Sequence, residues 1–289
     1  MQTATTGQLE NAQRIIIAQT RYTQEHNAPC MALFESMTLE RGAKQVTVPK
    51  VGQFEMADLI DGIDLVDEQE IGMTTVDLTT GEVGAKIILT DKLVRQENES
   101  PFKMVGRQFG DAGARKQDKD LIALFSAFNG GTALGADNKN LSMANWSACI
   151  AHAKANKFPM PIFGVHHPNA VYNVVSSAAV TPGSTYPIPD GFAQDLLKNF
   201  WSRIMINQVP LFEDGNIEAV SGQDSGYGVI ASKHAAVTLK SKGWDTERER
   251  DASLRATELV MTADYGCFEL DDGYGAAMLY EVGAIGTAA

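Results

Sequence analysis

The chain has 289 residues, 44% of them hydrophobic and 21% charged, and a formal net charge of −12. This length and composition are typical of a globular protein with one large or two modest domains. The acidic balance argues against a protein whose main task is to neutralise phosphate, because such proteins carry a basic face, but it does not exclude a small basic patch. No apolar run approaches the roughly 18–20 residues that cross a bilayer, so we expect no membrane contact.

The N-terminus has no charged leader, so no signal peptide is predicted. The three cysteines, Cys30, Cys149 and Cys267, are odd in number and far apart in the sequence. Because they form no C-x-x-C pair, they indicate neither a zinc site nor a disulfide framework. This pattern favours a cytosolic protein with reduced thiols.

The N-terminal third is poor in residues that could form a core. Residues 7–27 are polar and weakly helical, and we interpret them as an arm that needs another surface to lie on. Residues 45–48 alternate like a short strand, which should end at the proline that follows. Residues 73–78 and 85–89 flank a glycine turn and predict a strand–turn–strand unit. With the acidic stretch 55–70 between the strands, the region is expected to be an extended polar β excursion.

Residues 100–130 give the longest helical signal in the chain. Ser100 is a suitable N-cap, Pro101 suits the first helical position, and glycines 130 and 131 end the pattern. The expected helix would be about 40 Å long at about 1.5 Å per residue. Its middle, residues 115–120, is charged on all sides, which predicts a solvated or interfacial segment.

Shorter elements are expected in the second half of the chain, from apolar periodicity and turn residues. They are helices over 143–151 and 190–200, a strand over 161–165, a turn at 213–216, and strands over 257–261 and 276–280.

Motifs of common catalytic and binding sites are missing from the sequence. There is no G-x-x-x-x-G-K-[ST] loop, no H-E-x-x-H and no G-x-S-x-G, and the glycines at 273 and 275 lack the third glycine of a dinucleotide fingerprint. Four aspartates recur at every third position: Asp58, Asp61, Asp64 and Asp67. This spacing suits neither one helix face nor one strand face, so a solvated acidic stretch is favoured over a cation site. We predict no catalytic residue, no cofactor and no metal ligand.

The adjacent histidines His166 and His167, which end the apolar strand, are the strongest candidates for a catalytic or metal site. Adjacent residues on a strand point to opposite faces, so the two rings cannot easily serve one metal. A zinc site would also need further ligands. The preferred interpretation is structural: a strand end that turns at Pro168, with one histidine inside and one outside.

An arm, a polar loop and a long charged helix would make few contacts within a single chain. This suggests that they belong to a subunit and are covered by its neighbours. The segments "GVIASKHAAVTLKSK" (228–242), "WDTERERD" (244–251) and "VMTADYG" (260–266) resemble the C-terminal third of tailed-phage major capsid proteins. In that family they are an apolar strand and helix, a charged segment, and a strand before a final hairpin. The resemblance is specific over 228–282, although the order of elements is similar along the whole chain. It implies the α+β Hong Kong 97-like fold, which bacterial encapsulin shells share.

The resemblance also implies a division of the chain. The implied parts are an N-terminal arm (1–35), an extended β-hairpin loop with flanking strands (36–99), a peripheral domain with a long spine helix (100–164), an axial domain (165–246) and a return to the peripheral domain (247–289). The loop, centred on residues 44–90, would lie over the adjacent subunit. The two histidines would lie at the entry to the axial domain.

The implied function is that of a structural subunit and not of an enzyme. Hexamers and pentamers would close into an icosahedral phage head around double-stranded DNA, as part of the virion, after assembly in the host cytoplasm. The expected partners are other copies of the chain, a separate scaffold protein, a portal, in some members a decoration protein, and DNA held by non-specific contacts. An encapsulin-type cellular shell is the first alternative. A hydrolase that uses His166 or His167 is the second.

Two expectations concern contacts between subunits. The four aspartates of the acidic stretch are expected to meet three arginines across the subunit boundary: Arg248, Arg250 and Arg255. A plain solvated face is the alternative. Some members of the family also join a loop lysine to a neighbour's asparagine, with a glutamate as proton acceptor. Three lysines and two glutamates could serve here, namely Lys44, Lys50, Lys86, Glu258 and Glu269, but residues 247–289 contain no asparagine, so no cross-link is expected.

Overall fold

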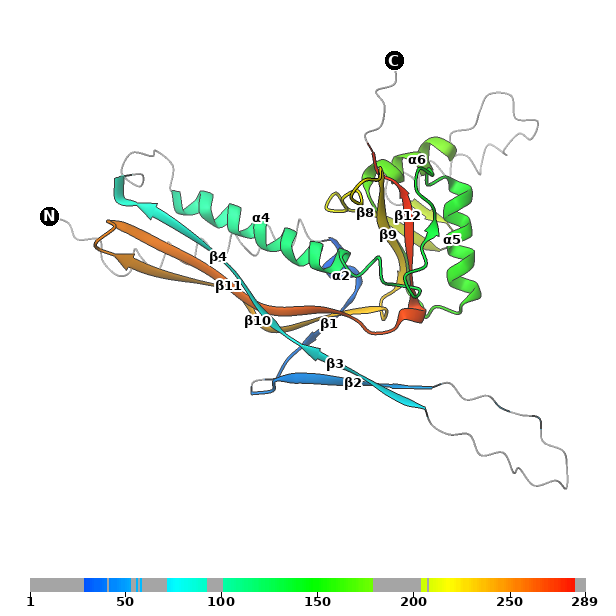
Figure 1. Ribbon diagram of the computed structural model, residues 1–289, viewed down its shortest axis with the longest axis horizontal. Helices are drawn as coiled ribbons and strands as arrows, with labels where there is room; N and C mark the ends of the chain where they lie inside the picture. Colours follow the sequence, from blue (N-terminus) through cyan, green and yellow to red (C-terminus); the bar gives the residue numbers. More distant parts are fainter. Residues whose placement is uncertain are drawn as a thin grey trace, which may run out of the picture.

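The computed structural model describes residues 29–40, 42–52, 56, 58, 72–92, 101–178, 204–206 and 208–283. The chain forms two β-sheets that pack against helices, and a two-stranded hairpin that projects from them (Figure 1). The mixed α+β character expected from the sequence is confirmed. No helix in these ranges is long and apolar enough to cross a membrane.

A long four-stranded sheet forms one half of the structure. Its strands, in spatial order, are β1 (Glu35–Thr38), β10 (Ala236–Asp251), β11 (Ala256–Glu269) and β4 (Gly81–Thr90). The β10–β11 and β11–β4 pairs are antiparallel, whereas β1 runs parallel to β10. Helix α4 (Pro101–Ile122) lies along this sheet (Figure 1). Val105 and Phe109 on the helix form one apolar cluster with Leu259 and Met261 on β11, and this contact holds helix and sheet together.

A compact six-stranded sheet forms the other half. Its strands, in spatial order, are β5 (Leu134–Gly135), β12 (Gly275–Glu281), β9 (Ser225–Ser232), β6 (Ile162–His166), β8 (Val209–Glu213) and β7 (Ile204–Ile206). Helices α5 (Met143–Ala155) and α6 (Pro168–Ala178) cover one face, with Trp146 at the centre of that core. Phe125 and Phe128, from the turns after α4, pack on the other face. Because both faces are covered, all five residues of β6 are buried.

The projecting hairpin consists of β2 (Gln45–Val51) and β3 (Met73–Thr79), paired antiparallel. Its base is anchored: Leu78 is fully buried in a cluster with Leu39, Val237 and Leu239. Its far end has no such anchor. Val51 and Met73 are paired there in the strand register, and they are 52% and 61% exposed.

The predicted strands are present in this region, but one predicted pairing is wrong. Residues 73–78 and 85–89 do not form a hairpin with each other, because β3 pairs with β2 and β4 pairs with β11. The strand at 45–48 also continues through Pro49, which a two-stranded ribbon tolerates because every strand in it is an edge. Alternation identified the strands, whereas the partners were decided by long-range packing.

The long helix is shorter than predicted. It begins at Pro101, as expected, but ends at Ile122, after which the chain makes turns as far as residue 131. Three residues near the end of these turns, Asn129, Gly130 and Gly131, have positive φ. The middle of the helix, predicted to be solvated or interfacial, is not solvated on all sides, because Gln117 and Asp118 are 3% and 0% exposed.

Other elements agree with the sequence to different degrees. The helix predicted at 143–151 is confirmed and extends to Ala155, with Ser142 as its N-cap. Residues 228–242, for which the resemblance implied a strand and a helix, contain the end of β9 and the start of β10 instead. Helix α6 begins at Pro168, where only a turn was expected. The helix predicted at 190–200 lies outside the described residues.

The division of the chain that the resemblance implies stays a prediction, and each half of the structure takes strands from several of its parts. Strand β10 belongs to the four-stranded sheet from residue 236 onward, although residues up to 246 were assigned to the axial domain. Strand β12, in the expected return segment, and helix α5, in the expected peripheral domain, both pack in the compact half. The two halves are therefore interleaved along the sequence.

Candidate functional site

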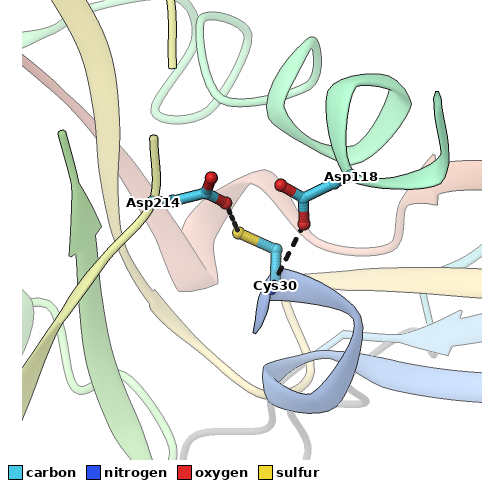
Figure 2. A group of neighbouring side chains, drawn as sticks. All are labelled: Cys30, Asp118 and Asp214. Carbon is cyan, nitrogen blue, oxygen red and sulfur yellow. Dashed lines mark hydrogen bonds between the residues drawn. The ribbon is translucent and has the colours of Figure 1, made fainter. Parts of the chain in front are cut away.

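Three side chains that could carry chemistry meet in the interior: Cys30, Asp118 and Asp214, which we call the junction cluster. Figure 2 shows the Cys30 side chain lying between the two carboxylates. Cys30 lies on α2 (Pro29–Leu33), Asp118 on α4, and Asp214 in the loop after β8. All three are buried. Their potential ligand atoms lie within 4.8 Å of one another.

Hydrogen bonds connect the three members and one neighbour, Asn216. The Cys30 Sγ donates to Asp214 Oδ2 at 3.0 Å, and the Cys30 amide donates to Asp118 Oδ1 at 3.3 Å. The side-chain Nδ2 of Asn216 donates to Asp118 Oδ2 at 2.8 Å, and the backbone N–H of Asn216 donates to Asp214 Oδ1 at 2.8 Å. The cluster thus joins three segments that lie far apart in the sequence.

Burial controls the electrostatics of the junction cluster. Desolvation, followed by the nearby Asp214 side chain, raises the pKa of Asp118 to about 7. Desolvation and the negative charges of both aspartates raise the pKa of the Cys30 thiol well above its usual value. The thiol therefore stays protonated at neutral pH.

A thiol and two carboxylates can in principle bind a metal ion, because deprotonated sulfur and carboxylate oxygen are both metal ligands. Here the thiol is protonated and donates its hydrogen to Asp214. The carboxylate oxygens accept from the neutral donors of Cys30 and Asn216. The geometry is that of a satisfied hydrogen-bond network, so we assign no metal to it.

A polar cavity of about 300 Å³ lies next to the cluster. It is lined by Pro29, Asp111, Arg115 and the loop residues 213–216, which include Asp214. Solvent in this cavity therefore reaches the edge of the cluster.

The two histidines occupy separate environments, as the structural interpretation predicts. His166 is fully buried, and its Nδ1 accepts a hydrogen bond from the His167 amide at 2.9 Å. Burial lowers the pKa of His166 to about 3, so its imidazole is neutral at physiological pH. His167 is only partly buried, and its Nδ1 accepts from the Asn169 amide at 3.1 Å. Each ring thus caps its own local backbone, an arrangement that offers no support for the hydrolase alternative.

The charged residues expected at subunit boundaries are only partly visible. Asp61, Asp64 and Asp67 lie outside the described residues, and Asp58 is exposed. Arg250 makes a two-pronged ion pair with Asp91 of its own chain, in which Nη2 and Oδ2 lie 2.7 Å apart, and this pair raises the pKa of Arg250.

Arg248 and Arg255 lie near the Arg250–Asp91 ion pair. The Arg255 carbonyl accepts from the Asp91 amide at 3.0 Å. Burial and the charge of Arg250 lower the pKa of Arg248. The structure therefore gives Arg250 a partner within the subunit, and the contact with the aspartates of a neighbour remains a prediction.

Two of the lysines considered as cross-link donors are held by carboxylates of the same chain. Lys50 Nζ lies 2.6 Å from Asp271 Oδ1, and Lys86 pairs with Glu258. Burial and the hydrogen bond with Asp272 raise the pKa of Glu269 to about 7. A lysine in an ion pair is an ammonium without a free lone pair, so these contacts do not prepare an attack on a carboxyl carbon.

Sequence reasoning missed the junction cluster. Its members stand at positions 30, 118 and 214, and no motif spacing links them. One signal was available: Cys30 precedes a short apolar segment, and a free cysteine is among the residues most often buried. Nothing in the charged run 115–120 distinguishes the buried Asp118 from the exposed charges beside it.

Comparison with known proteins gives no match by sequence and many by structure. No family model and no curated protein matches the chain. Among solved structures, 205 chains match. The capsid of cyanophage Pam1 has a TM-score of 0.65 at 11% identity and covers 87% of this chain and 89% of that chain. The capsid of a GTA particle has a TM-score of 0.67 at 10% identity, with 88% and 90% covered.

An encapsulin also matches, with a slightly lower TM-score and a similar coverage. The SrpI encapsulin complex of Synechococcus elongatus has a TM-score of 0.61 at 12% identity and covers 90% of both chains. At these identities the likeness establishes the fold: the chain has the Hong Kong 97-like fold of tailed-phage capsid proteins, which the GTA capsid and the encapsulin share. The resemblance drawn from residues 228–282 is confirmed.

Proposed function

We propose that the chain is the structural subunit of an icosahedral phage head, in which hexamers and pentamers enclose double-stranded DNA. The observation that carries the proposal is the match to solved capsids over nearly nine-tenths of both chains. A match of this extent leaves little of the chain for a different activity. The resemblance of residues 228–282 favours the phage head over the cellular shell.

The projecting hairpin supports assembly between copies of the chain. Its base is fixed in a core, but its far end presents Val51 and Met73 to solvent, and Met56 beyond them is fully exposed. Burial of apolar area contributes about 25 cal/mol per Å². A neighbouring subunit that covered this end would gain such a contribution, which the single subunit lacks.

Contact with a packaged genome would have to be local, because the chain as a whole is acidic. Lys103, Arg107 and Arg115 are exposed along α4 and form a candidate surface for phosphate. Binding through a few such residues is independent of base sequence and weakens as salt rises. This fits the non-specific DNA contact expected of a head protein.

Expression of the full chain, followed by size-exclusion chromatography and negative-stain electron microscopy, tests assembly. We expect closed particles of megadalton size, formed with or without a co-expressed scaffold protein. A small, stable oligomer under both conditions contradicts the proposal. Assembly conditions should include low and moderate salt, because exposed charge pairs are screened.

The encapsulin-type shell is the second candidate, because the encapsulin match covers 90% of both chains. The contents of native particles distinguish the two. Nuclease-protected double-stranded DNA is expected inside a phage head, whereas a defined enzyme cargo without DNA identifies a cellular shell.

A further inference from the structure

The turn that follows α4 contains the one asparagine–glycine pair of the sequence, Asn129-Gly130. Asn129, Gly130 and Gly131 all have positive φ, a backbone region that glycine adopts readily and asparagine tolerates. Gly130 is exposed and Asn129 is only partly buried, although the preceding Phe128 is fully buried. Water therefore reaches the pair at the edge of a packed region.

An asparagine that precedes a glycine can react with its own backbone. The backbone nitrogen of the glycine attacks the side-chain carbonyl carbon of the asparagine, and no Cβ on the glycine hinders the approach. A bond forms between this nitrogen and Cγ, and the bond from Cγ to Nδ2 breaks. Nδ2 leaves as ammonia with the proton that the backbone nitrogen loses, and a succinimide ring remains. Water then opens the ring to aspartate or isoaspartate.

Both reacting groups of this pair are held by hydrogen bonds. The Gly130 N–H donates to both oxygens of Asp272, at 3.0 Å to Oδ1 and 2.8 Å to Oδ2, and we call these two bonds the clamp. The Asn129 Nδ2, which would be the leaving group, donates to the Thr132 carbonyl at 2.9 Å. Asp272 begins the short helix η1 (Asp272–Tyr274), directly before β12. The clamp thus joins two segments that lie 142 residues apart in the sequence.

The clamp opposes the attack for an electrostatic reason. The backbone nitrogen is a nucleophile only after it has lost its proton. A carboxylate at hydrogen-bond distance disfavours this loss, because the resulting negative charge would lie beside the charge of Asp272. A hydrogen bond to a charged acceptor also holds the N–H more strongly than a bond to a neutral acceptor.

We propose that Asn129 is a site of spontaneous deamidation and that the clamp protects it in the folded subunit. While the clamp is closed, the Gly130 nitrogen keeps its proton and Asn129 stays intact. When the turn opens, Gly130 attacks and the change is irreversible, so the modified fraction records how often the turn has opened. The proposal concerns one subunit and does not depend on the shell function.

Peptide mass spectrometry on the unassembled full chain tests the protection. The protein is kept at mildly alkaline pH in water enriched in heavy oxygen and is then digested with pepsin in acid, which stops the reaction. Heavy oxygen in the peptide that contains residue 129 marks the water that opened the ring. We expect the folded chain to deamidate at this residue at least about tenfold more slowly than the same chain in urea, the effect of one hydrogen bond to a charged group. Equal rates overturn the proposal.

Matched variants assign the protection to the clamp. Asp272→Ala removes the acceptor and should raise the deamidation rate of Asn129 in the folded subunit by at least about tenfold. Alanine is used because an asparagine before Gly273 would create a second reactive pair. Asp245→Ala is the control, because Asp245 pairs with Lys242 on β10, and it should keep the wild-type rate.

Other outcomes also decide the question. An unchanged rate in Asp272→Ala contradicts the clamp. A slower rate contradicts it as well, because the carboxylate would then act as a base that promotes the attack. If circular dichroism shows that Asp272→Ala does not fold, Asp272→Ser, which also lacks the charge, takes its place. The comparison of the folded and unfolded wild-type chain stands in either case.

Discussion

Single residues fix the compact half of the structure through close approaches that leave no room for a side chain. Strand β6 passes under Trp146, and a Cβ added to Gly164 would lie 2.3 Å from the Trp146 Cη2 atom. Gly228, on the adjacent β9, faces the buried His166 ring in the same way, at 2.2 Å. These glycines are needed for space, since neither has a positive φ.

Gly164→Ala is expected to lower the free energy of unfolding of the unassembled subunit by about 1–3 kcal/mol, the usual cost of overpacking a core. Urea unfolding followed by tryptophan fluorescence measures it. Gly243→Ala is the control, because a Cβ at Gly243 meets nothing within 4 Å. Equal unfolding midpoints for the two variants would contradict this account of β6.

At the scale of elements, the hairpin β2–β3 has two ends with different roles. Leu78 at the base is part of the subunit's own core, whereas Met73 at the far end is exposed. The proposed assembly assigns the far end to a neighbouring subunit. A substitution at Leu78 should therefore change the stability of the free subunit, whereas one at Met73 should change the yield of particles.

Leu78→Ala is expected to lower the free energy of unfolding of the free subunit by about 2–5 kcal/mol, because it leaves a cavity in a closed core. Met73→Ala is expected to leave that free energy unchanged and to reduce the yield of particles in sedimentation. A normal particle yield for Met73→Ala, together with full stability, would remove the far end of the hairpin from the proposed contact.

The hairpin also shows how far sequence patterns reach at this scale. Alternation and turn residues located β2, β3 and β4 to within a few residues. They did not reveal that β4 pairs with β11, a strand more than 160 residues later, instead of with β3. A two-residue repeat specifies which face of a strand is buried, but not which strand lies beside it.

At the scale of the whole molecule, the ion pairs of the loop lysines support a shell without covalent links. Lys50 and Lys86 already pair with carboxylates of their own chain, and residues 247–289 contain no asparagine that could accept an amine. The stability of the proposed particle would then rest on apolar burial, on charge pairs or on an added protein.

Mature particles boiled in denaturant and reductant are expected to run on a gel as one band near 31.2 kDa, the mass of the chain. Intact-mass spectrometry of the same sample should show no loss of water or ammonia relative to the sequence. A ladder of larger species that survives this treatment would disprove the absence of cross-links.

The sequence by itself indicated the fold. Residues 228–282 carried the resemblance to capsid proteins, and the strand and helix patterns placed most elements. Local physics suffices for these features, because alternation, helix caps and turn residues act over a few neighbouring positions. The structural interpretation of His166 and His167 also followed from the geometry of a strand alone.

Tertiary structure alone decided the interleaving of the two halves, the partner of β4 and the junction cluster. The burial of Asp118 is the clearest case, because it stands in a charged run and only the approach of α2 and the loop after β8 removes it from water. Desolvation and a second carboxylate then raise its pKa to about 7. Both effects require residues that are brought together from far along the chain, and a single sequence does not state which distant segments will meet.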